Sequence, residues 1–197
     1  EYPLYSPKPG WNEQDPMDWW VGAYTSLHKA IDKSGIDAGN IKSLSFSGQM
    51  HGLVAMDKDG NVIRRAFLWN DQRCAKQCQD LLQDLGGFEE LRRFTNNNML
   101  PGYQGGKILW LREVEPENYQ KMKKAILPKD YLRYQLTGEY CTDASDASGT
   151  GFFDVEKREH SWELLDRLNI PRDLFPPVVE SSEVTGVVTK EAAELTG

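Results

Sequence analysis

Hydrophobic positions along the chain follow two periods, one of three to four residues and one of two. In residues 16–35 they recur every three or four positions, which is the spacing of one buried face of an α-helix. Asp15 and Pro16 precede this pattern as an N-cap and a first-turn proline, and Gly35 follows it. Similar patterns predict helices at residues 72–85, 88–94, 105–114, 116–124, 128–136 and 162–168.

The period of two predicts strands. Leu44 and Phe46 alternate with serines, as in a strand at residues 43–47 with one buried face. Two apolar runs, 53–56 and 62–68, flank an Asp-Gly turn signal and predict a β-hairpin. Shorter apolar runs predict strands at residues 125–127 and 151–154. Because strands and helices alternate along the chain, the predicted class is α/β.

The hairpin should bring two groups of polar and aromatic side chains together at one rim of a sheet. Residues 49–51 (Gln-Met-His) lie at its start between Gly48 and Gly52, and glycines allow a sharp turn and a close approach to a ligand. Residues 69–71 (Trp-Asn-Asp) follow its end. We therefore expect both groups to converge on one small volume.

Each group has chemistry that suits a polyhydroxylated ligand. A methionine offers an apolar wall, and an imidazole can exchange a hydrogen bond with a hydroxyl. An indole face suits the apolar side of a sugar, while an amide and a carboxylate suit adjacent hydroxyls. The residues alone leave structural roles open. His51 can be an ordinary hydrogen-bonded histidine, and Asp71 can cap the next helix or pair with Arg73.

The charge of the chain limits its partners. With 30 acidic and 23 basic residues the formal net charge is −7, and an acidic surface repels nucleic acid and anionic membranes. No apolar stretch is long enough to cross a membrane, and no signal peptide is expected. The cysteines are odd in number and the three histidines lack ligand spacing. We therefore expect reduced thiols, a cytoplasmic protein and no metal site.

Several spaced motifs resemble, in the same order, those of the FGGY carbohydrate kinases. The segment 47–52 (Ser-Gly-Gln-Met-His-Gly), the hairpin and the segment 69–73 (Trp-Asn-Asp-Gln-Arg) are similar to that family's sugar-binding strand and loop. The Gln-Met-His form is that of the xylulokinases, whereas an Arg-Glu pair is typical of the glycerol kinases. Further matching motifs are residues 10–16 with Trp19 and Trp20, 107–111, 127–132 and 142–150.

The resemblance implies an actin-like, ribonuclease-H-like first domain over residues 1–197, with a mixed sheet flanked by helices. It implies a whole protein that transfers the γ-phosphoryl group of ATP to D-xylulose with Mg²⁺, and it allows a homodimer. The residues it implies for sugar binding are Met50, His51, Trp69, Asn70 and Asp71. The residues it brings to the site or its cleft with less direct roles are Gln49, Arg73, Tyr103, Gln104, Asp143 and Asp146.

Two segments that contribute to this second group differ from the family pattern or fit a structural role as well. Gln104 stands where a Pro, Ser or Thr is usual in the family signature, and Val114 stands where a polar residue is usual. Asp143 and Asp146 are three residues apart in a run of small residues and resemble a segment that faces the cleft. Capping and turn roles are the alternative for these two carboxylates.

Phosphoryl transfer needs further groups: a phosphate-cradling loop, a metal held by carboxylates, and a base or orienting group. The chain has neither a P-loop nor a dinucleotide fingerprint. By the resemblance, the phosphate hairpin is expected before Glu1, and the catalytic aspartate and adenine-binding domain after Gly197. No catalytic residue is thus expected within residues 1–197, and the chain alone should phosphorylate nothing. The alternatives are a family kinase for ribulose or gluconate, or a carbohydrate-binding module without catalysis.

Overall fold

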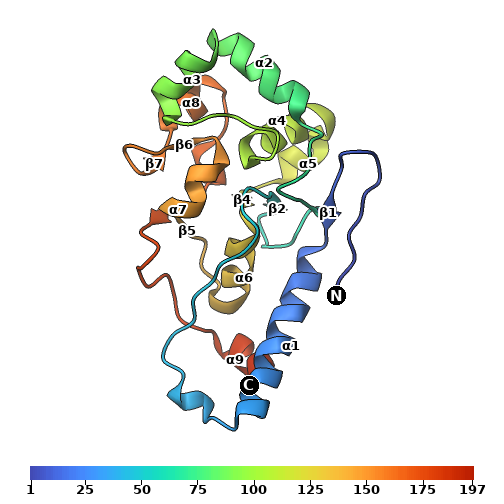
Figure 1. Ribbon diagram of the computed structural model, residues 1–197, viewed down its shortest axis with the longest axis vertical. Coiled ribbons are helices and arrows are strands. Elements are labelled where there is room, and N and C mark those ends of the chain that lie inside the picture. The colour runs from blue at the N-terminus through green and yellow to red at the C-terminus, as the bar shows by residue number, and fades with distance from the viewer.

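Short strands and longer helices alternate through residues 1–197, all of which the computed structural model describes (Figure 1). The α-helices are α1 (Pro16–Ser34), α2 (Ala75–Leu85), α3 (Phe88–Thr95), α4 (Gln104–Val114), α5 (Pro116–Lys121), α6 (Pro128–Thr137), α7 (Ala144–Ala147), α8 (Trp162–Arg167) and α9 (Lys190–Thr196). The 3-10 helices are η1 (Ala38–Asn40), η2 (Ser148–Thr150) and η3 (Arg172–Leu174). The strands are β1 (Glu13–Gln14), β2 (Val54–Met56), β3 (Ala66–Phe67), β4 (Lys124–Ile126), β5 (Thr142–Asp143), β6 (Phe153–Asp154), β7 (Glu159–His160) and β8 (Val178–Val179).

The strands pair two by two. β1–β3, β2–β4 and β6–β7 are antiparallel pairs, whereas β5–β8 is parallel. The predicted hairpin is present: Leu53 and Phe67 exchange backbone hydrogen bonds of 3.0 and 3.1 Å across it. Gly60 adopts a φ of 81° in its turn, which a glycine reaches without strain. The hairpin also pairs with neighbours on both sides, since β3 binds β1 and β2 binds β4.

The strand predicted at residues 43–47 is not formed. The chain runs without regular structure through residues 41–49, and residues 43–49 make no backbone–backbone hydrogen bond. Leu44 is 42% exposed, whereas Phe46 is half-buried. A strand exists only where a neighbouring strand shares its hydrogen bonds, and none lies beside this segment. The alternation of apolar residues was therefore not sufficient to predict a strand.

Most helix boundaries follow the predicted caps. Asp15 accepts a hydrogen bond of 2.9 Å from the Met17 amide at the start of α1, and Gly35 ends the helix with a φ of 66°. Gly138 ends α6 in the same left-handed conformation. The helix predicted at residues 116–124 stops at Lys121 instead, because the following residues form β4 and pair with β2. Helix α9 was not predicted.

The hydrophobic core has two main parts, which lie towards the two ends of the long axis (Figure 1). One part packs α2, α4 and α8 around Leu91, Ile108 and Leu111. The other packs α1 and α6 around Trp19, Trp20 and Tyr131. The hairpin lies between them, because β2 and β3 contribute side chains to both parts. None of the helices combines the length and the apolar character that crossing a bilayer would require.

Candidate functional site

The backbone turns sharply at His51. The Gly52 amide donates a 2.8 Å hydrogen bond to the Met50 carbonyl, which closes a three-residue turn, and His51 has a φ of 66°. Such left-handed backbone at a non-glycine residue costs on the order of 1–3 kcal/mol and is concentrated at functional sites. Gly52 is required next to it, because a Cβ there would lie 2.6 Å from Pro128 Cγ and 2.9 Å from the Phe67 carbonyl oxygen.

The imidazole of His51 is held on two sides. Its ring stacks on the Tyr103 ring with centroids 4.6 Å apart and an angle of 35° between the planes. Its Nδ1 lies 2.8 Å from the carbonyl oxygen of Gly149. Burial lowers the pKa of His51 below its usual value, against the hydrogen bond to Gly149, and the charge of Lys107 lowers it further. The ring is therefore a neutral hydrogen-bonding group at about pH 7.

A buried lysine fixes the loop that carries Tyr103. Lys107 is fully buried, and its Nζ donates hydrogen bonds of 3.1 Å to the carbonyls of Pro101 and Tyr103 and a third to the carbonyl of Gly102. Burial lowers the pKa of this lysine to about 8. Because one ammonium group binds three successive carbonyls, the Tyr103 ring is held firmly against His51.

Gln104 holds the turn at His51 in place from inside the protein. Its side chain is buried, and its Nε2 donates a 3.3 Å hydrogen bond to the carbonyl of Gly52. A Pro, Ser or Thr at this position would not reach that carbonyl in the same way, so the departure from the family signature has a local structural role. The side chain ties α4 to the turn at His51 and is covered by the protein.

Two large apolar side chains are exposed around this turn. Met50 is 49% exposed and Trp69 is 52% exposed. The loop carrying Trp69 lies against the loop that carries Tyr103, since a Cβ on Gly102 would be 2.8 Å from the Trp69 carbonyl oxygen. Trp69, Asn70 and Gln49 also line one open groove of about 1010 Å³. An exposed methionine and tryptophan beside an imidazole make a surface suited to the apolar and hydroxyl parts of a sugar.

Asp71 and Arg73 lie beneath this surface, where neither side chain is exposed. The guanidinium Nε and Nη2 of Arg73 bind the two oxygens of Asp71 at 2.9 and 2.7 Å. The Asp71 carboxylate also accepts from the backbone amides of Arg73 and Asn12. The pairing considered from the sequence is thus present, and all of these contacts hold the loop under Trp69 and Asn70.

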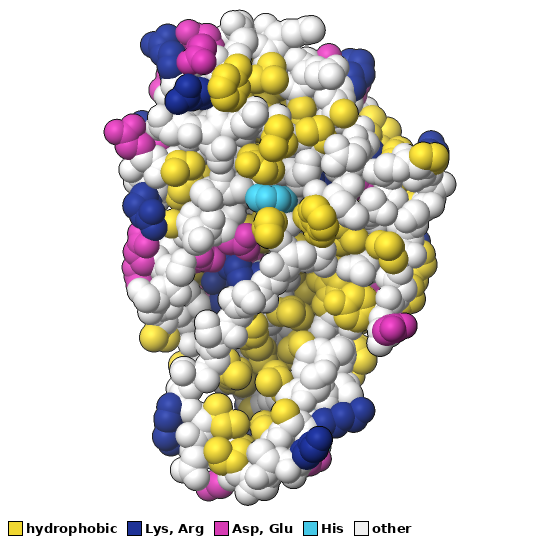
Figure 2. Space-filling model, in the orientation of Figure 1, with side chains coloured by type: hydrophobic (Ala, Val, Ile, Leu, Met, Phe, Trp, Pro, Cys, Tyr) yellow, Lys and Arg dark blue, Asp and Glu magenta, His cyan; other side chains and the backbone are white.

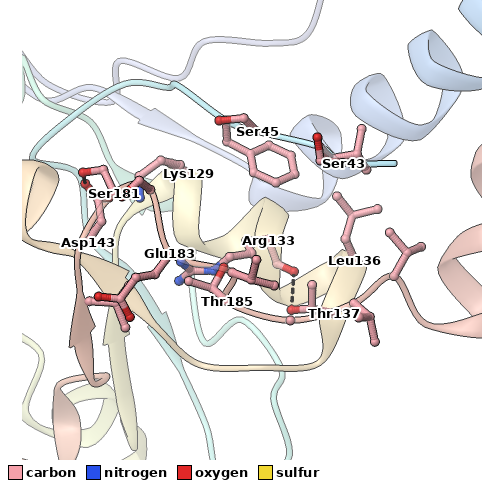
Figure 3. A pocket seen from close by; sticks show the side chains of 18 of the residues that line it. Ser43, Ser45, Lys129, Arg133, Leu136, Thr137, Asp143, Ser181, Glu183 and Thr185 are labelled. Atoms are coloured by element: carbon pink, nitrogen blue, oxygen red, sulfur yellow. Dashed lines mark hydrogen bonds and ion pairs between the residues drawn. The ribbon is translucent and has the colours of Figure 1, made fainter. Parts of the chain in front are cut away.

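Asp143 borders a different cavity, of about 580 Å³, between residues 42–46, α6 and residues 179–188 (Figure 3). Lys129 lies between carboxylates: its Nζ is 2.6 Å from Asp143 and 3.7 Å from Asp146, and it also binds Asp130 at 2.8 Å. On the face drawn in Figure 2, acidic and basic side chains meet inside a hollow whose lower part is lined by hydrophobic atoms.

The two carboxylates differ in their surroundings. Asp143 is the N-cap of α7, and its Oδ2 accepts a 3.4 Å hydrogen bond from the Asp146 amide. Burial raises the pKa of Asp143, but hydrogen bonds from Lys129 and Ser181 outweigh this effect and bring it to about 2. Burial raises the pKa of Asp146 to about 6, with Lys129 opposing the shift. The capping role that the sequence left open is present at Asp143.

Candidate metal-ligating side chains are not clustered in this chain. No group of three or more histidine, cysteine or acidic side chains in residues 1–197 is arranged to hold a metal ion. The cysteines Cys74, Cys78 and Cys141 are buried and free.

The structure thus divides the predicted residues into three groups. Gln49, Met50, His51, Trp69, Asn70 and Tyr103 lie around one turn and the groove beside it, while Asp71, Arg73 and Gln104 support the turn from inside the protein. Asp143 lines the second cavity, and Asp146 lies near it across Lys129. The sequence did not point to Gly149 as a partner of His51, because 98 residues separate the two and no local pattern connects them.

The model of the FGGY family of carbohydrate kinases, N-terminal domain, matches residues 1–197, which is the entire chain. The chain belongs to the FGGY family of carbohydrate kinases.

Two bacterial relatives of this chain are both described as xylulose kinases. The xylulose kinase of Escherichia coli (strain K12) is 40% identical over 191 residues, which are 97% of this chain and 38% of that protein. The xylulose kinase of Lactococcus lactis subsp. lactis (strain IL1403) is 43% identical over 195 residues, which are 98% of this chain and 38% of that protein. The chain therefore spans about two fifths of the length of these FGGY relatives.

Solved structures confirm the predicted actin-like first-domain fold. The xyloylose kinase from Brucella ovis aligns with a TM-score of 0.90 and 35% identity, covering 97% of this chain and 39% of that one. The gluconate kinase from Lactobacillus acidophilus aligns with a TM-score of 0.90 and 29% identity, covering 100% and 39%. Glycerol kinase from Plasmodium falciparum has a TM-score of 0.89 at 21% identity, and this likeness shows the fold alone.

Proposed function

We propose that the whole protein containing this chain is an ATP-dependent kinase that phosphorylates D-xylulose, and that residues 1–197 are its sugar-binding domain. The observation that carries the proposal is the turn at His51, where a strained backbone presents an imidazole that packs on Tyr103 and follows the exposed Met50. The FGGY relatives at 34–43% identity are xylulose kinases, which supports a ketopentose as the sugar.

Each residue has a distinct part in this proposal. Met50 and the Trp69 ring cover the carbon-bound hydrogens of the sugar, and His51 exchanges a hydrogen bond with one of its hydroxyls. Asn70 offers an amide in the groove that Trp69 and Gln49 also line. Asp71 acts through the loop that it holds, because its carboxylate is saturated with hydrogen bonds from the protein.

ATP with Mg²⁺ supplies the transferred γ-phosphoryl group when bound. The contribution of residues 1–197 is to bind and orient the acceptor sugar, because positioning accounts for much of the catalysis in phosphoryl transfer. Closure of a second domain over the bound sugar would exclude water and limit hydrolysis of ATP. The chain's free cysteines support a cytoplasmic protein, and its acidic charge supports one that binds neither nucleic acid nor membranes.

A coupled kinase assay on the whole protein tests the proposal. D-xylulose, D-ribulose, D-gluconate and glycerol are compared as acceptors at equal ATP, and the largest kcat/KM is expected for D-xylulose. A larger kcat/KM for another acceptor would assign the protein to a different substrate within the same family. ATP hydrolysis without an acceptor product would count against a sugar kinase altogether.

The role of His51 is tested by His51→Ala. We expect the KM for D-xylulose to rise by about tenfold or more, which corresponds to about 1–3 kcal/mol for a lost hydrogen-bond partner. Val114→Ala is the control, since Val114 is an exposed apolar residue at the far end of α4 and no contact at the turn depends on it. An unchanged KM in a folded His51→Ala protein would remove His51 from the sugar site.

A second candidate is a gluconate kinase, because a gluconate kinase structure from Lactobacillus acidophilus matches with a TM-score of 0.90, as does a xylulose kinase structure from the same organism. Gluconate carries a carboxylate, so its site should present a cation near the hydroxyl-binding residues. Lys107, whose charge acts on His51, already has its Nζ bound to three carbonyls, and Lys129, which lines the groove with Trp69 and Asn70, is already paired with Asp130 and Asp143. We therefore rank gluconate behind D-xylulose.

A further inference from the structure

The hydrogen bond between His51 and Gly149 fixes which of the two groups is the donor. A carbonyl oxygen can only accept a hydrogen bond, so the 2.8 Å contact requires His51 Nδ1 to carry a proton. A neutral imidazole carries one proton, and the other nitrogen then has a free lone pair. Burial and the nearby Lys107 ammonium both favour the neutral ring. Nε2 is therefore the bare nitrogen in this arrangement.

That bare nitrogen remains available to a ligand. Nε2 of His51 has no hydrogen-bond partner within the chain, and it is not among the buried polar atoms that lack one. It therefore reaches the surface beside Met50, which is half exposed. Tyr103 covers one face of the imidazole, so rotation of the ring away from Gly149 would break its contact with Tyr103.

Gly149 fits against the ring so closely that only a glycine can stand there. A Cβ on this residue would lie 2.2 Å from Cε1 and 2.3 Å from Nδ1 of His51. Its peptide is also fixed: Asn97 donates a 2.8 Å hydrogen bond to the carbonyl of Ser148, and the Thr150 hydroxyl donates at 2.7 Å to the carbonyl of Ala147. The accepting carbonyl is thus part of a rigid turn.

We propose that Gly149 is a positioning residue that fixes the tautomer of His51, so that Nε2 accepts a hydrogen bond from a hydroxyl of the substrate. This inference rests on the proposed sugar site. It adds which chemical group of the sugar His51 contacts. A bare nitrogen repels a carbonyl oxygen and attracts a hydroxyl, so His51 contacts a hydroxyl of the ketopentose and not its ketone. Gly149 does not itself touch the sugar.

The tautomer can be measured directly on the whole protein by ¹⁵N NMR with selectively labelled histidine. The His51 signals are assigned as those missing from His51→Ala. We expect Nδ1 to be protonated and Nε2 to be unprotonated in the sugar-free protein at neutral pH. Addition of D-xylulose should shift the Nε2 resonance while it stays unprotonated. A protonated Nε2 in the sugar-free protein would overturn the proposal.

Gly149→Ala tests the role of the glycine. The backbone at residue 149 is not in the left-handed region, so the added Cβ is the only perturbation. We expect the KM for D-xylulose to rise about tenfold with little change in kcat, since a lost hydrogen bond is worth about that much. The imidazole should also lose its single tautomer. Val114→Ala is again the control, because Val114 is an exposed residue at the far end of α4.

The outcomes separate this inference from the proposed function. An unchanged KM in Gly149→Ala, with Nδ1 still protonated, contradicts the role of Gly149. If Gly149→Ala does not fold, the tautomer and its response to D-xylulose in the unmodified protein decide the question. If the unmodified protein does not phosphorylate D-xylulose, the proposed substrate is wrong, whereas the tautomer in the sugar-free protein still shows whether Gly149 sets it.

Discussion

The carboxylate of Asp71 and the guanidinium of Arg73 are buried against each other with no exposed side-chain surface. Trp11 and Phe67 cover the guanidinium, with ring centroids 3.9 and 4.4 Å from its carbon. A buried pair of this kind is costly to break, because removal of one partner leaves an uncompensated charge in the interior. The loop with Trp69 and Asn70 therefore depends on an interaction that no ligand reaches.

Asp71→Asn should lower the free energy of unfolding by up to about 3–5 kcal/mol, because Arg73 then keeps only the Glu13 carboxylate, 2.8 Å from its Nη1, as a buried counter-charge. Urea unfolding followed by tryptophan fluorescence on the whole protein measures this change. Lys58→Ala is the control, since the Lys58–Asp59 pair is exposed and should contribute at most about 1 kcal/mol. Equal effects of the two substitutions would show that the buried pair has no special role.

His51→Gly and His51→Ala should differ in stability although both remove the imidazole. A glycine adopts the left-handed φ of 66° without strain, so we expect the glycine variant to be more stable than the alanine variant by about 1 kcal/mol. Thermal unfolding compares the two proteins. Both should bind D-xylulose equally weakly. A more stable alanine variant would mean that the turn is not formed as described.

Trp69→Ala should weaken sugar binding with little effect on stability. The indole is about half exposed, so its removal leaves no large cavity. If the ring covers the apolar side of the sugar, the KM for D-xylulose should rise about tenfold or more. Steady-state kinetics and a thermal melt of the same preparation check both statements. A KM within experimental error of the unmodified protein would exclude Trp69 from the site.

Asp143 and Asp146 should respond to pH in opposite directions. The pKa of folded Asp143 is about 2, below its unfolded value, so its stabilising effect is present above about pH 4 and is lost as the pH falls. The pKa of folded Asp146 is about 6, above its unfolded value, so the folded state favours the protonated form. That stabilisation is present below about pH 4 and is lost as the pH rises through 6.

Two substitutions test this assignment at about pH 7 and about pH 4. Asp143→Asn should reduce the free energy of unfolding by about 1 kcal/mol at the higher pH, after allowance for solvent screening. Asp146→Asn should increase it by roughly 1–3 kcal/mol at the higher pH and have little effect at the lower one. Urea unfolding at both values provides the comparison. A destabilised Asp146→Asn protein at the higher pH would contradict the burial argument.

Local patterns in the sequence were enough to predict most of the helices and the hairpin. Asp15, Gly35 and Gly138 act through hydrogen bonds and φ angles within a few residues of themselves, so their effects can be read directly from the sequence. The Asp-Gly turn signal correctly predicted the chain reversal at Gly60. These features depend on neighbouring residues in the chain and need no knowledge of the tertiary structure.

Features that depend on distant partners were not predictable in the same way. The alternation of Leu44 and Phe46 fits a strand, but strand formation needs a neighbour that the local pattern cannot supply. Asp71 has the residue type of a sugar ligand, yet its burial against Arg73 follows from packing around Trp11 and Phe67. The contact from Gly149 to His51 joins two turns that only the complete fold brings together.

The lack of backbone–backbone hydrogen bonds at residues 43–49 has a practical consequence for handling the protein. A row of free amides and carbonyls beside an exposed leucine is a template on which any other extended chain can add. At high concentration, a second copy of residues 1–197 offers the same open segment. Preparations of this piece alone should therefore self-associate by strand addition as concentration increases, and charged substitutions at Leu44 should suppress that tendency.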